Sequence, residues 1–106
     1  MAMREPSLLA DAAARAQRYL DGLPDRPVAP SPQALAALAQ LDLPLPDGPS
    51  DPAGILDRLD RIVSPATVAM AGPRFFGFVI GGALPVTVAS NWLATAWDPN
   101  TGPHGI

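Results

Sequence analysis

The placement of proline is the feature that most constrains how this chain can fold. Fourteen of its 106 residues are proline. Proline inside a helix removes a backbone hydrogen bond and clashes with the preceding turn. Helices are therefore expected only in four stretches, at 7–23, 32–41, 52–63 and 85–97. The proline-rich connectors between the first three are expected to be extended spacers.

Three of these stretches carry the start signals and periodicity of amphipathic helices. Ser7, Ser31-Pro32 and Asp51-Pro52 are expected to begin them, since such residues accept hydrogen bonds from the first free N–H groups and proline suits the first turn. Apolar residues then recur at three- and four-residue spacing. Asp11 and Arg15 have the order of a weak i,i+4 ion pair. We expect them, with the other charged residues, to form a solvated face.

The sequence between the third and fourth helices is less regular. Residues 66–70 are compatible with a short strand or with one more helical turn. Residues 73–79 are expected to be extended, because they are rich in β-branched and aromatic side chains. Gly81-Gly82 permits a change of direction before the helix at Pro85. That helix is apolar on nearly every side, and we expect it to be buried almost all round.

Composition excludes several classes of function. The chain has no cysteine, and all seven of its basic residues are arginine. The absence of lysine rules out attachment of a carbonyl cofactor through a lysine amine and a Walker-type phosphate loop. A net charge of −3 argues against nucleic-acid binding. His104, the single histidine, has no neighbours at the spacing of a triad or metal site.

A charge-free segment spans residues 75–97 and contains all three phenylalanines and both tryptophans. Its length matches a transmembrane helix, but clustered glycine, Pro85 and Asn91 disfavour insertion. The N-terminus lacks the apolar region of a secretory signal, so a cytoplasmic location is expected. We therefore expect this segment to bind a protein partner or further sequence of the same protein.

Two sequence segments carry a resemblance to a known family. Residues 72–85 read GPRFFGFVIGGALP, and residues 91–100 read NWLATAWDPN. In this order they resemble the N-terminal region of the pyridoxal-phosphate-dependent group II amino-acid decarboxylases, the family of the aromatic-amino-acid and glutamate decarboxylases. The upstream helices and spacers follow the layout of that region with weaker residue identity.

The resemblance implies a fold and an assembly. Members are homodimers of the fold type I, aminotransferase-like α/β architecture with pyridoxal 5'-phosphate as cofactor. This chain would be mainly α, with N-terminal helices and proline-rich spacers over residues 1–71 and an extended motif plus an apolar interface helix over residues 72–106. It would be the dimerisation and substrate-pocket segment of an amino-acid decarboxylase. The catalytic α/β domain and the cofactor lysine are expected in further sequence, so the chain alone is expected to be inactive.

The resemblance also assigns residues to the site. One group matches a segment that borders the substrate pocket in the family: Phe76, Gly77, Phe78 and Val79. A second group matches residues that approach the active site from across the dimer: Asp98, Pro99 and Asn100. No catalytic, cofactor-binding or metal-binding residue is assigned to this chain.

Departures from the family pattern bear on the substrate. Gly77-Phe78 stands where glutamate decarboxylases carry Asn-Gln, which favours an aromatic or other less acidic amino acid. Pro99 replaces a common glutamine, and Gly72 replaces a common histidine. The alternative from another class is a small helical interaction module, or the remnant of a decayed gene, that docks through its apolar 75–97 stretch.

Overall fold

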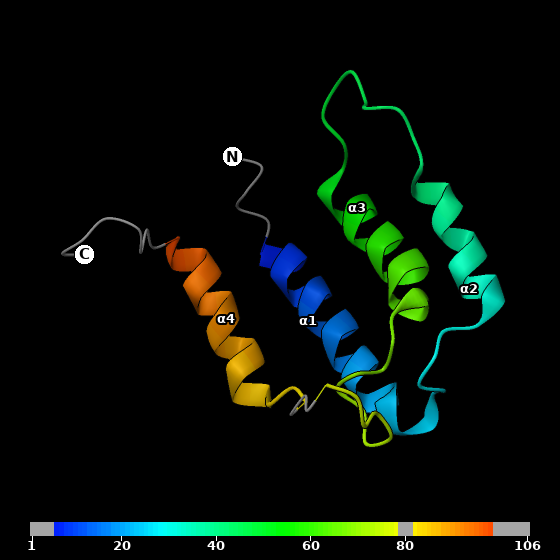
Figure 1. Cartoon of the computed structure of the whole chain (residues 1–106). Coiled ribbons are helices and arrows are strands. Elements are labelled where there is room, and N and C mark those ends of the chain that lie inside the picture. Colours follow the sequence, from blue (N-terminus) through cyan, green and yellow to red (C-terminus); the bar gives the residue numbers. More distant parts are fainter. Residues whose placement is uncertain (1–5, 79–81, 99–106) are drawn as a thin grey trace, which may run out of the picture.

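The computed structural model describes residues 6–78 and 82–98, and within these ranges all regular structure is helical. Figure 1 shows the longer helices, which are α1 (Pro6–Gly22), α2 (Pro32–Ala37), α3 (Pro52–Arg58) and α4 (Pro85–Trp97). Shorter helical turns extend three of them: η1 (Leu23–Asp25), η2 (Leu38–Leu41), η3 (Leu59–Val63) and η4 (Ser64–Ala66). The expectation of a mainly α chain is confirmed for this part of the sequence.

The starts of α2 and α3 follow the proline signals. The Ser31 hydroxyl accepts a hydrogen bond from the Ala34 amide at 3.1 Å, and the Asp51 carboxylate accepts one from the Gly54 amide at 3.2 Å. In both helices proline occupies the first turn, where its missing N–H has no intrahelical partner to lose. The expected cap at Ser7 is not found, because α1 already begins at Pro6.

The third helix changes its winding before it ends. After α3 the chain forms a π-helical turn, η3, and then the 3-10 turn η4. Pro65 lacks an N–H, and its ring would crowd the carbonyl four residues earlier in a regular helix. A wider turn before Pro65 accommodates that ring. The chain becomes extended at Thr67, so residues 66–70 form neither a strand nor a further turn of α-helix.

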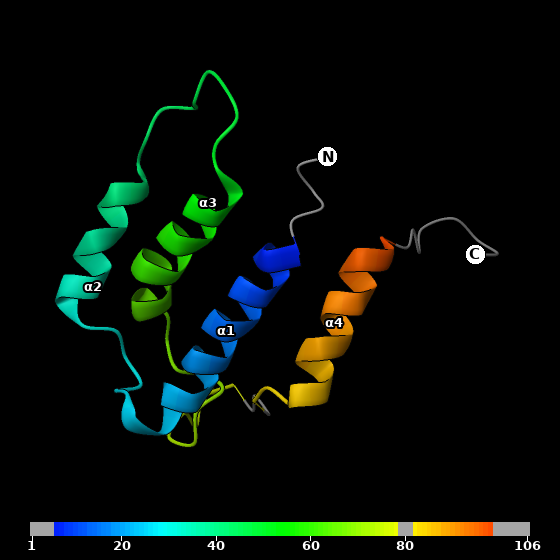
Figure 2. The same cartoon turned by 180° about the vertical axis from the view of Figure 1, so that it is seen from behind.

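Few side chains are fully buried. Among the described residues the apolar core consists of Leu23, Ile62 and Ala69, which are 4%, 4% and 2% exposed. They come from η1, from η3 and from the loop that follows η4. Figures 1 and 2 show α1 alongside α3, and half-buried residues of α1 extend the contact along its length. In contrast, Ile55 and Leu59 of the predicted apolar stripe remain exposed.

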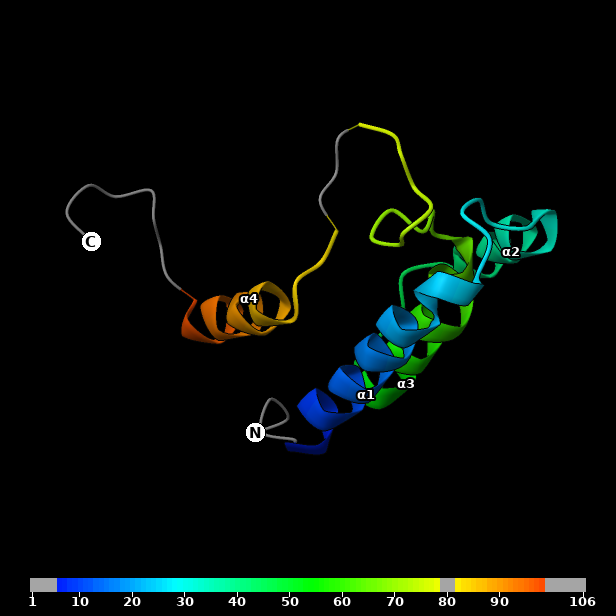
Figure 3. The ribbon, with the colours of Figure 1, turned by 90° about the horizontal axis from the view of Figure 1, so that it is seen from below.

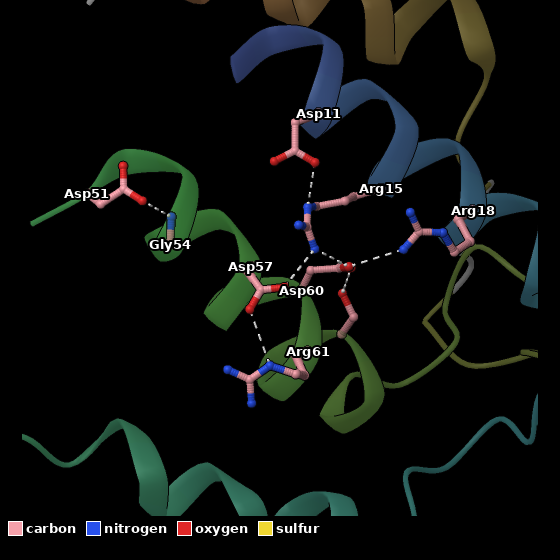
Figure 4. Close-up of polar contacts among 9 residues, drawn as sticks. Asp11, Arg15, Arg18, Asp51, Gly54, Asp57, Asp60 and Arg61 are labelled. Carbon is pink, nitrogen blue, oxygen red and sulfur yellow. Dashed lines mark hydrogen bonds and ion pairs between the residues drawn. The ribbon is translucent and has the colours of Figure 1, made fainter. Parts of the chain in front are cut away.

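Arg15 connects α1 to the third helix through a cluster of carboxylates (Figure 4). Its guanidinium donates to Asp11 of its own helix at 2.9 Å and, across the interface, to Asp60 at 2.9 Å and Asp57 at 3.4 Å. Hydrogen bonds to Asp60 and Asp11 hold the pKa of Arg15 above its ordinary value. The predicted Asp11–Arg15 pair is confirmed, but the solvated face is wrong for Arg15, whose side chain is only 21% exposed.

A second arginine joins the loop after α1 to the end of η4. Arg26 donates to the carbonyls of Ser64, Pro65 and Thr67 at 3.2, 3.4 and 2.9 Å. Its guanidinium also lies 5.2 Å from the centre of the Tyr19 ring, within the range of cation–π attraction. The Ser64 carbonyl also accepts from the Thr67 amide and hydroxyl, whereas the carbonyls of Pro65 and Thr67 lie at and just after the end of a helical segment, where intrahelical donors are lacking. Arg26 therefore satisfies them and fixes the loop.

The fourth helix stands apart from the other three. Figures 1 and 3 show α4 beside α1, on the side opposite α3 and α2 and separated from that group. No residue of α4 is fully buried. The expectation that this helix is buried almost all round is therefore not met within the chain. Among the described residues, no helix combines the length and apolar character needed to cross a membrane.

The small core makes a sharp prediction for Ile62. Ile62→Ala is expected to lower the free energy of unfolding by roughly 2–5 kcal/mol, because it removes buried methylene groups and leaves a cavity. The matched control is Ile55→Ala, which makes the same change at an exposed position and is expected to cost less than about 1 kcal/mol. Urea unfolding followed by circular dichroism measures both. Equal costs at the two positions would contradict the described core.

Arg15 allows a second stability prediction. Arg15→Met is expected to lower the thermal midpoint of unfolding more than Arg61→Met does. Arg61 is 60% exposed and pairs only with Asp57, at 3.3 Å, and exposed pairs contribute little. Loss of Arg15 leaves the carboxylates of Asp11 and Asp60 close to α1 without their shared donor. Differential scanning calorimetry checks the order, and a larger loss for Arg61→Met would refute it.

Candidate functional site

The predicted substrate-side residues lie in an exposed turn between the first three helices (α1 to α3, with the turns that extend them) and α4. Phe76 and Phe78 are 90% and 86% exposed, and Gly77 between them is half-buried. Val79 lies outside the described residues. The segment is not extended as expected, because residues 73–74 and 77–78 form turns. Two large aromatic side chains are thus presented to solvent within three residues.

The backbone of this turn is strained at one aromatic residue. Phe78 has a φ of 57°, in the left-handed region that bulky side chains rarely adopt. Its ring stacks on that of Phe75, with centroids 6.4 Å apart and planes inclined by 26°. A Cβ at Gly77 would lie 3.0 Å from the Phe75 ring, so the stacked pair requires glycine between its members. The backbone conformation of Phe78 and its stacking on Phe75 together set the direction in which the Phe78 side chain points.

The outer face of α4 adds a second exposed apolar group. Val86, Leu93 and Trp97 are spaced by seven and four residues, which places them on one face of the helix. All three are exposed, and α4 carries no charged residue. Val88 and Trp92, on the opposite face, are half-buried toward α1. The helix therefore presents apolar side chains on two sides, and among the described residues only the side with Val88 and Trp92 faces another helix.

The predicted cross-dimer residues begin where α4 ends. Asp98 closes the helix in a left-handed conformation, with φ 48° and ψ 51°, and its amide donates to the carbonyls of Ala94 and Thr95. Pro99 and Asn100 lie outside the described residues, as does His104. Thirteen residues of α-helix span about 20 Å. The Phe76–Phe78 turn and Asp98 thus lie at opposite ends of α4 and are not brought together within one chain.

A groove between α1 and α4 was not predicted from the sequence. It encloses about 460 Å³ and is lined mainly by small and apolar side chains, among them Ala13, Ala16, Leu20, Val88 and Trp92. Alanine at positions 13 and 16 of α1 leaves space opposite the large Trp92 ring. The alanine content of α1 was visible in the sequence, but the position of α4 opposite these alanines was not.

The described residues do not by themselves fit pyridoxal phosphate. The sequence contains no lysine that could hold the cofactor covalently. The α1–α4 groove offers Gln17 and Asp21 as its polar residues, and a carboxylate repels a phosphate. A second groove, of about 420 Å³, includes Arg18 and Arg26, but the Arg26 guanidinium is already bonded to three carbonyls. Neither groove provides a phosphate site.

Comparisons with known proteins leave the function to be argued from residues and geometry. No family model, no curated protein and no solved structure matches the chain.

The strained turn yields a prediction that a matched pair of variants can test. Glycine adopts a left-handed conformation freely, whereas another residue there costs roughly 1–2 kcal/mol. Phe78→Gly is therefore expected to give a protein roughly 1 kcal/mol more stable than Phe78→Ala, because both variants lose the ring and its stack but only glycine relieves the strain at φ 57°. Urea unfolding measures the difference. Equal stabilities would show that Phe78 is not strained in solution.

Proposed function

We propose that this chain is the N-terminal dimerisation and substrate-pocket segment of a pyridoxal-phosphate-dependent amino-acid decarboxylase. Its partners would be the lysine-bearing catalytic part of the enzyme and the second subunit of a homodimer. The cofactor would be held entirely by that catalytic part, because the residues described for this chain do not fit it. With the proposal comes a cytoplasmic location, as the sequence pattern predicts.

The observation that carries the proposal is the charge-free segment with its exposed aromatic and aliphatic side chains. Phe76, Phe78 and the outer face of α4 together expose more large apolar groups than the chain buries. Obligate interfaces resemble a core divided between two partners. The segment that resembles the decarboxylase motif also holds all of the exposed phenylalanine and tryptophan side chains among the described residues. Exposure and resemblance thus point to the same residues.

The separation of the two predicted site regions supports a dimeric arrangement. Phe76 precedes α4 and Asp98 follows it, with about 20 Å of helix between them, which favours placing the two residues at different pockets. In the proposed enzyme the turn would border the pocket of one subunit, and the end of α4 would approach the pocket of the other. Gly77-Phe78 offers this pocket an aromatic ring and no side-chain donor, which favours an aromatic or other weakly acidic amino acid as substrate.

Reconstitution tests the proposal directly. The gene downstream of residue 106, or a neighbouring reading frame, is expected to encode the cofactor lysine. Co-expression of that polypeptide with this chain is expected to give a stable complex that releases CO₂ from amino acids, with aromatic substrates preferred over glutamate. Should no lysine-bearing partner be encoded, and the chain instead bind an unrelated protein through residues 75–97, the interaction-module alternative would hold.

A pair of charge substitutions locates the interface. Leu93→Asp is expected to weaken the complex by tenfold or more, since a carboxylate buried in an apolar interface costs about 2 kcal/mol or more. The matched control is Leu45→Asp, which replaces a leucine that is 91% exposed in the connector before α3 and should leave the affinity unchanged. Isothermal titration calorimetry measures both. Equal weakening by the two variants would exclude α4 as the specific interface.

A further inference from the structure

We propose that Arg74 is a positioning residue, which fixes the Phe75–Phe78 turn to the end of α1. Its significance for a substrate pocket rests on the proposed function, whereas the positioning itself is a property of this chain. The residue stands directly before the turn and contacts the segment that follows α1, about fifty positions earlier in the sequence.

The contacts of Arg74 converge on two backbone carbonyls. Its Nη2 group donates to the carbonyl of Pro24 at 3.2 Å and to the carbonyl of Arg26. Both acceptors lie at or just after η1, the short turn that continues α1. A charged donor makes stronger hydrogen bonds than a neutral one. One side chain therefore joins the start of the aromatic turn to the end of α1.

Arg26 connects the same two segments in the opposite direction. Its backbone carbonyl accepts from Arg74, while its guanidinium donates to Ser64, Pro65 and Thr67. We call Arg26, Arg74 and the carbonyls that they bind the arginine clasp. The clasp is continued by a backbone hydrogen bond from the Ala69 amide to the Val28 carbonyl, at 2.9 Å. Residues 64–74 are thus attached to residues 24–28 at several points.

Close packing beneath the clasp leaves little space for the chain to shift. A Cβ at Gly72 would lie 3.2 Å from the Ala69 carbonyl and 3.6 Å from the Leu23 carbonyl. Leu23 and Ala69 belong to the small core. On the other side of the turn, Gly82 has a φ of 87° and no residue of α4 is fully buried. The position of the turn is therefore set by α1, not by α4.

Limited proteolysis of the full-length chain tests the proposal. Chymotrypsin cleaves after aromatic residues, and cleavage in a folded chain requires local opening. Arg74→Ala is expected to raise the rate of cleavage after Phe76 and Phe78 at least threefold, while hydrogen exchange at the amides of α3 stays unchanged. Arg74→Lys is expected to restore most of the protection, because an ammonium group can also donate to two carbonyls. Arg58→Ala, at an exposed arginine of α3, is the matched control.

Hydrogen exchange at the Ala69 amide provides an independent readout. This amide bonds to Val28 within the clasp, so its exchange is expected to accelerate in Arg74→Ala and to recover in Arg74→Lys. Unchanged cleavage and exchange in Arg74→Ala would overturn the proposal. Equal acceleration of exchange at the amides of α3 would also overturn it, since the effect would then be general unfolding. Neither experiment uses cofactor or partner, so the decarboxylase proposal stands or fails separately.

Discussion

Arginine side chains join the helices and loops of this chain at several points, beside a small apolar core. Only three residues among those described are fully buried apolar groups, and one of them is an alanine. The contact between α1 and the third helix instead includes Arg15 with its carboxylates, and the loops beyond them are joined by Arg26 and Arg74. Such contacts are directional, so they define an arrangement without burying much surface. Many large apolar side chains remain exposed to solvent.

The exposed aromatic side chains among the described residues lie in one part of the sequence, whereas exposed aliphatic side chains such as Leu9 and Leu45 also occur elsewhere. Phe76, Phe78, Val86, Leu93 and Trp97 are all exposed, and they lie within the charge-free segment. Keeping such groups in water does not stabilise an isolated domain. Burying them would, because each buried methylene group contributes about 0.8 kcal/mol. An interface segment must expose them until its partner binds. The small core and the exposed segment thus follow from the same distribution of residues.

Much of the helical structure could be predicted from the sequence, because its signals are local. Ser31 and Asp51 cap the helices that they were expected to begin, and Gly82 takes the positive φ expected where the chain changes direction. The role of Arg15 could not be predicted in the same way. Its i,i+4 partner lies in the same helix, but its contact with Asp60 depends on how the third helix packs.

The candidate site was predicted as a set of residues rather than as a shape. Resemblance indicated Phe76, Gly77, Phe78 and Asp98, but nothing local placed the turn and Asp98 at opposite ends of α4. Turns at residues 73–78 take the place of the expected extended segment, and Arg74 within them binds carbonyls after α1, a contact between residues about fifty positions apart. Long-range contacts of this kind are absent from periodicity and propensity, which describe neighbours in sequence.

The central claim is that the 75–97 segment is an interface surface rather than part of a self-sufficient core. Hydrogen–deuterium exchange of the isolated chain, resolved to single helices, tests it most directly. The account predicts that the amides of α4 exchange at least tenfold faster than those in the middle of α1, and that they become protected when the catalytic partner is added. Equal protection of α4 and α1 in the monomeric chain would contradict it.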